Sequence, residues 1–202
     1  MKKVVLTIAA LAFGIASFAS VNSNGNNNVE GVEKSEVVTL TAKLNTTMSL
    51  DIDNSPVLFN FVTLDEFRKG MGKYEGEYSS KGTISSTANW NLSYRATGAF
   101  THTDGVTTMP LDNVGLSAKF TGKNHVKNNA TGTPLPLTES RTTILGHDGH
   151  QSNAGDETDN AFTIYWEMGT KKGNMNNKSI FEQDLKKGEY NTKVEFVASE
   201  VL

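Results

Sequence analysis

Residues 90–96 read Trp-Asn-Leu-Ser-Tyr-Arg-Ala, and residues 162–168 read Phe-Thr-Ile-Tyr-Trp-Glu-Met. In both stretches apolar residues alternate with more polar ones, so every second side chain lies on the same face. This alternation is typical of a β-strand with one buried face and one face in solvent. The two stretches decide the fold class, because they predict β-strands whose inward residues include Trp90 and Trp166. Both tryptophans should anchor the core, since each buries a large apolar area.

The same period of two recurs along most of the chain. It is found in residues 38–44, 48–52, 114–120 and 190–198, with turn-forming residues between these stretches. Residues 57–62 (VLFNFV) are apolar enough to predict a strand covered on both sides. About eight to ten short strands without long helices between them predict an all-β fold. We expect an immunoglobulin-like antiparallel β-sandwich with long polar loops.

One short helix interrupts the strand pattern. Thr63 and Glu66 have the spacing of a capping box, in which each side chain bonds the backbone N–H of the other residue. Gly70 is a helix-ending residue, so the helix has little more than two turns.

The first residues have the pattern of a bacterial export signal. Lys2 and Lys3 precede an apolar run over residues 4–18, and Ser17-Phe18-Ala19 supplies the small residues of a cleavage site. The run is too short for a membrane-spanning helix. We therefore expect a signal peptide at residues 1–19, no membrane span, and export to the bacterial cell surface, the periplasm or the medium.

The remaining chain divides into an Asn/Gly-rich leader at residues 20–36 and a single β-sandwich domain at residues 37–202. The chain has no cysteine, which excludes disulfides and thiolate metal sites. Its formal net charge is −3, and it becomes about −5 when Lys2 and Lys3 leave with the signal peptide. An acidic surface argues against a nucleic-acid partner, because phosphate binding needs a basic patch.

Near the C-terminus, Leu185-Lys-Lys-Gly-Glu-Tyr190 resembles the L-x-P-G-x-Y tyrosine corner of immunoglobulin-like sandwiches, with Lys187 where Pro is common. This motif followed by a last alternating strand, together with residues 37–44, is similar to bacterial surface and pilus-subunit sandwiches. These include alternate chaperone–usher pilins, spore-coat-U-like domains and WxL-like domains, of which the last share Trp90-Asn-Leu92. The resemblance covers the two ends of the chain. It implies a non-enzymatic structural or adhesive subunit that associates with itself or with other envelope proteins.

Residues 37–44 have two interpretations. They follow the polar tract at residues 21–31, and their apolar side chains share one face: Val38, Leu40, Ala42 and Leu44. A polar leader before an alternating strand is the layout of a donor strand, which completes the sheet of a neighbouring subunit by β-augmentation. Alternatively, the segment pairs within its own sheet, as first strands usually do.

An alternative function is a secreted module that binds a metal or a glycan through the polar loops at residues 122–140 and 146–160. The second loop holds candidate ligands for Ca²⁺ or another divalent metal: His147, Asp148, His150, Asp156 and Asp159. The same composition also fits a solvated loop, because Gly, Asn and Asp favour turns. Tyr165 lies opposite Trp166 on its strand and is a candidate exposed aromatic for a glycan. The motifs G-x-S-x-G and H-E-x-x-H are absent, and we expect neither an enzyme nor a required cofactor.

Overall fold

The computed structural model describes residues 34–53 and 55–201. The predicted signal peptide (residues 1–19) and most of the predicted leader (residues 20–36) lie outside the described residues. The chain divides after Leu44 into two units, residues 1–44 and residues 45–202. In the first unit, residues 34–44 contain no helix or strand and their side chains are exposed.

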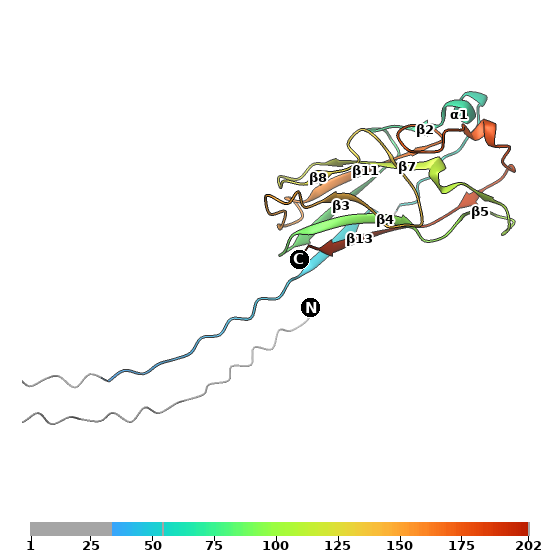
Figure 1. The fold of residues 1–202 in the computed structure, drawn as a ribbon. Helices are drawn as coiled ribbons and strands as arrows, with labels where there is room; N and C mark the ends of the chain where they lie inside the picture. Colours follow the sequence, from blue (N-terminus) through green and yellow to red (C-terminus); the bar gives the residue numbers. More distant parts are fainter. Residues whose placement is uncertain (1–33, 54, 202) are drawn as a thin grey trace, which may run out of the picture. The chain divides into compact units, whose positions relative to one another are not determined.

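Residues 45–202 form two main antiparallel sheets, which confirms the predicted all-β sandwich (Figure 1). The first sheet contains β1 (Met48–Ile52), β2 (Met71–Gly72), β3 (Ser79–Ser86), β7 (Val114–Phe120), β9 (Leu135–Pro136) and β11 (Ala161–Met168), in the order β1-β3-β11-β7-β9 with β2 also beside β11. The second contains β4 (Trp90–Ala96), β8 (Lys127–Asn128), β10 (Thr142–Gly146) and β13 (Val194–Glu200), in the order β13-β4-β10-β8. A small third sheet joins β5 (Phe100–His102), β6 (Thr108–Met109) and β12 (Tyr190–Asn191).

The core lies between the two main sheets, where the alternation places it. On β4 the inward residues Trp90, Leu92, Tyr94 and Ala96 are buried, and on β11 so are Phe162, Ile164, Trp166 and Met168. The ring of Trp166 meets that of Phe196 edge-on, with centroids 6.1 Å apart, so the two sheets contact directly. Burial of each large side chain stabilises the fold by about 1.5–3 kcal/mol.

The predicted helix is confirmed as α1 (Leu64–Lys69), and two 3₁₀ turns, η1 (Leu111–Asn113) and η2 (Ile180–Gln183), accompany it. The Thr63 hydroxyl accepts the Glu66 N–H, and the Glu66 carboxylate accepts the Thr63 N–H. Gly70 ends the helix at a φ of +79°, and a Cβ there would lie 2.4–2.5 Å from backbone atoms of the chain segment after β11. Only glycine fits so close a backbone approach.

The strand expected at residues 57–62 is not formed. Residues 56–62, which we name the strap, belong to no strand, although the side chains alternate. Val57, Phe59 and Phe61 pack against the core, whereas Leu58 and Val62 are exposed. One face of the strap therefore packs on the core. The other face is apolar but open, because no strand of the described chain lies beside it.

The sandwich begins later than the predicted residue 37. Its first strand is β1, and residues 37–44 are neither in a strand nor in a backbone hydrogen bond among the described residues. Pairing of this segment within its own sheet is therefore not found. Within the described part of the chain, no helix has the length and apolar character needed to cross a membrane.

Candidate functional site

Among the described residues, the two main sheets each leave one strand edge unpaired on the same side of the sandwich. β1 is the edge of the first sheet and pairs with β3, while β13 is the edge of the second and pairs with β4. The Thr46 hydroxyl donates to the Glu200 carboxylate at 3.1 Å, so the start of β1 lies beside the end of β13. Unpaired edges are templates for a further strand.

Between these edges lies a groove of about 1280 Å³. Its apolar lining comes from β1, the strap, the inner faces of both sheets and the segment before β13: Leu50, Ile52, Val57, Phe59, Phe61, Trp166, Met168, Leu185, Val194 and Phe196. A hollow of this size leaves part of the inner faces of both sheets uncovered by the described chain, whereas protein interiors are normally close-packed.

The strap forms one lip of this groove. Among the described residues, none of the backbone groups of residues 56–61 makes a hydrogen bond. The strap is instead held at its end, where the Val62 N–H donates to the Glu66 carboxylate at 2.7 Å. Its extended backbone is therefore free to pair with another strand.

β13 forms the opposite lip. Its inward residues Val194, Phe196 and Ala198 were expected in the core, yet they are only half-buried. Their partners on β4, Ala96 and Leu92 among them, are fully buried. The side chains of β13 do face inward, but the space beyond this strand is not filled by the described chain.

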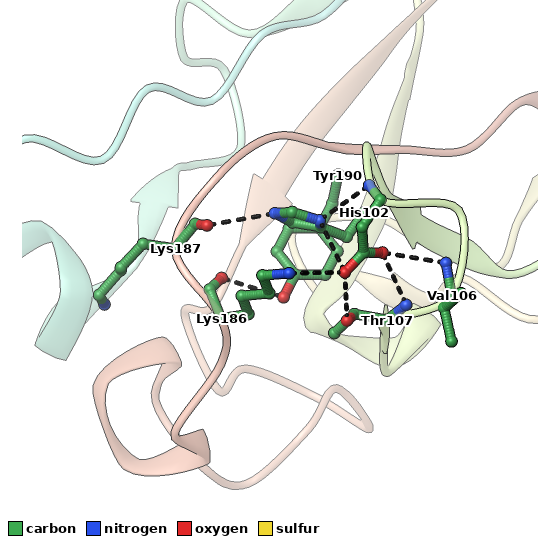
Figure 2. Close-up of polar contacts among 7 residues, drawn as sticks. His102, Val106, Thr107, Lys186, Lys187 and Tyr190 are labelled. Carbon is green, nitrogen blue, oxygen red and sulfur yellow. Dashed lines mark hydrogen bonds and ion pairs between the residues drawn. The ribbon is translucent and has the colours of Figure 1, made fainter.

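Residues 185–191 precede β13 and form the same side of the groove as β13. The Tyr190 hydroxyl donates to the Lys186 carbonyl at 3.0 Å, as the tyrosine-corner pattern predicts (Figure 2). Gly188 has a φ of +139°, and a Cβ at this position would lie 2.2 Å from the His102 ring. The lip thus rests closely on the hairpin formed by β5 and β6.

The four candidate strand-exchange residues are exposed in the first unit. Val38 is 82% exposed and Leu40 and Leu44 are each 94% exposed, while Ala42 is also exposed. Side chains two residues apart on an extended chain are about 6.6 Å apart, so the apolar face spans about 20 Å. Exposed apolar residues in regular alternation on an unpaired segment are typical of a docking strand.

The five candidate metal ligands are not brought together. The Asp148 carboxylate accepts the backbone N–H groups of His150 and Gln151, and these bonds hold its pKa below the usual value. Asp156 likewise accepts from Thr158 and Asp159, and its pKa is lowered by these bonds. In the described part of the chain, no three His, Cys, Asp or Glu side chains form a group that would hold a metal ion. These carboxylates stabilise turns.

Tyr165 lies on the outer face of β11, opposite Trp166, as its position in the sequence predicts. It is half-buried, and its ring meets that of Tyr74 edge-on with centroids 5.3 Å apart. A pair set edge to face does not present one flat surface for a sugar ring.

Two features of the site were missed by sequence reasoning. The first is the unpaired backbone of the strap, which was not predicted because its apolar composition suggests a covered strand. Asn60 in the middle of the strap is a sign of an exposed face. The second is the contact between Asp104 and Lys186, which are 82 positions apart and which no sequence motif connects.

Comparisons with known proteins leave the function open. No protein-family model matches the chain, and no curated protein does either. The function therefore has to be inferred from the groove, its two free strand edges and the exposed segment at residues 37–44.

Proposed function

We propose that this protein is an exported, non-enzymatic structural or adhesive subunit of a bacterial surface, which assembles with copies of itself by strand exchange. Residues 37–44 of one copy would enter the groove of the next. The observation that carries this proposal is the groove between β13, whose outer edge is unpaired among the described residues, and the strap, whose residues 56–61 make no backbone hydrogen bond there. An extended segment can add to such an edge by β-augmentation, and residues 37–44 are an exposed segment with the alternation that a strand requires.

The donor segment has the chemistry that the groove requires. Its backbone N–H and C=O groups would pair with β13 on one side and with the strap on the other. Val38, Leu40, Ala42 and Leu44 would point to the groove floor. Burial of each Val or Leu contributes about 1.5–3 kcal/mol, so the contact is stable without a covalent link. This matters because the chain has no cysteine to form one.

Export remains part of the proposal. Its support is the pattern of residues 1–19, with two lysines before an apolar run and small residues after it. An assembly held by strand pairing and apolar burial does not depend on the redox state of its surroundings.

The experiment is size-exclusion chromatography with light scattering on mature protein beginning at Ser20. We expect oligomers whose size rises with concentration and which collapse to monomer when residues 21–44 are deleted. Deletion of residues 21–36 alone is the matched control, since it shortens the leader and keeps the donor segment, and it should still assemble.

Two results would contradict the proposal. Polymers that persist after deletion of residues 21–44 would mean that another surface joins the subunits. A monodisperse wild-type monomer whose deletion variant unfolds would mean that the segment is a strand of its own sandwich.

A further inference from the structure

Residues 185–189, the lip, are irregular and line the groove before β13, the strand on which the proposed donor would pair. Residues 184–189 belong to no strand, and the pairing of β12 with β5 begins at Tyr190. One backbone hydrogen bond joins this lip to the hairpin β5–β6, from the Thr103 N–H to the Glu189 carbonyl at 3.0 Å. The other contacts that hold the lip come from side chains (Figure 2).

Asp104 is the centre of these side-chain contacts. Its carboxylate accepts from the Lys186 ammonium at 2.8 Å and from the Thr107 hydroxyl at 2.7 Å. It also accepts the backbone N–H groups of Val106 and Thr107, each at 2.9 Å. The bond from Lys186 is the largest of the effects that hold the pKa of this carboxyl well below its usual value. Asp104 therefore remains charged and ties Lys186 to the hairpin.

His102 fixes the next residue of the lip. Its Nε2–H donates to the Lys187 carbonyl at 3.1 Å, while its Nδ1 accepts the Asp104 N–H at 3.0 Å. The ring is buried and lies edge-on to Tyr190, with centroids 5.0 Å apart. Lys187 in turn places its ammonium 4.3 Å from the centroid of the Phe67 ring on α1.

We propose that Asp104 is a positioning residue for strand exchange, and that it acts through Lys186 to hold residues 185–189 ready for the incoming donor. This inference rests on the proposed function. A lip that is already ordered spares the donor the entropic cost of ordering it on binding, and such preorganisation raises affinity and rate.

The location of the ion pair separates this role from a purely structural one. The Asp104 side chain is 26% exposed and that of Lys186 is 55% exposed, so the pair lies at the surface and outside the core. A surface ion pair adds little to global stability. Its loss should therefore loosen the lip and leave the sandwich folded.

The experiment measures the assembly rate of the full mature chain by light scattering, alongside its melting temperature. Lys186→Met removes the ion pair and keeps the bonds of Asp104 to Val106 and Thr107. We expect assembly about five- to tenfold slower, the size expected for the net contribution of one ordinary hydrogen bond, at a nearly unchanged melting temperature. Lys186→Arg should restore the wild-type rate.

Two further variants separate this contact from general surface charge. Asp104→Asn combined with Lys186→Met should be no slower than the slower single variant, because both remove the same interaction. Asp65→Ala breaks the exposed pair Asp65–Lys69 on α1, 2.6 Å long, and should not change the rate.

The outcomes are distinguishable. A wild-type rate in Lys186→Met, or additive slowing in the double variant, overturns the inference and leaves strand exchange intact. Slowing that merely follows a fall in melting temperature overturns it as well. A wild-type chain that does not assemble overturns the proposed function and this inference with it.

Discussion

The two sides of the sandwich treat their strand edges in opposite ways. On one side, the chain between β7 and β10 folds over the edges as the two-residue strands β8 and β9, and it buries Ala130 and Leu137 completely. On the other side, β1 and β13 end the sheets, Leu58 and Val62 are exposed, and a groove remains. Short edge strands and covering loops are how proteins block unwanted pairing. The strand edges are therefore covered on one side of the sandwich and open on the other. The open side is where the proposed donor would enter.

The largest difference between the two sides is expected from a substitution in the donor segment, residues 37–44. Leu40→Asp should abolish assembly, because a charge would have to be buried without a partner in the groove. At a concentration too low for assembly the melting temperature should not change, since Leu40 is 94% exposed in the single chain. Thr41→Asp, on the opposite face of the same segment, is the control and should still assemble. Light scattering of both variants at one concentration checks this, and equal assembly would rule out the donor role.

The second test compares the two sides by side-chain truncation. Leu137→Ala on the covered side should lower the free energy of unfolding by about 2–5 kcal/mol, because it leaves a cavity in a packed core. Leu58→Ala on the open side should change it by less than about 0.5 kcal/mol, as expected for an exposed position. Urea denaturation measures both, and similar losses at the two positions would show that the strap is buried in solution.

The smallest effect concerns acid stability at the open side. The pKa of Asp104 is lower in the folded protein than its ordinary value of 3.8, so its contribution is complete above that value and is lost as the pH falls through the folded pKa. The difference in melting temperature between wild type and Asp104→Asn should therefore be constant above about pH 5 and shrink only below about pH 4. A difference that disappears near neutral pH would assign it to another group.

Sequence patterns predicted the parts of the fold that depend on local periodicity. The alternation around Trp90 and Trp166 identified two central strands and their inward faces, and the Thr63–Glu66 spacing identified the helix. The Tyr190 bond to Lys186 followed from its motif, because its partners are close in the chain.

The remaining features depend on neighbours that a local pattern does not specify. β8 and β9 have two residues each, and a stretch of two residues has no period. The strap alternates like a strand, but alternation reports which side chains are packed and not whether a second strand lies beside the backbone. The acidic loop at residues 146–160 suggested ligands from its composition, while the use of Asp148 and Asp156 in turns depends on their backbone geometry.

The positions of the two tryptophans have a spectroscopic consequence. Trp90 is completely enclosed, with its indole N–H on the Asn153 carbonyl at 2.7 Å, whereas Trp166 lines the groove floor and donates to the Ser80 hydroxyl at 3.2 Å. Filling the groove would cover the 7% of Trp166 that is exposed and shift its emission slightly to shorter wavelength, while the emission of Trp90 would stay unchanged. With no other tryptophan in the chain, the molecule carries an intrinsic optical probe of groove occupancy together with its own internal reference.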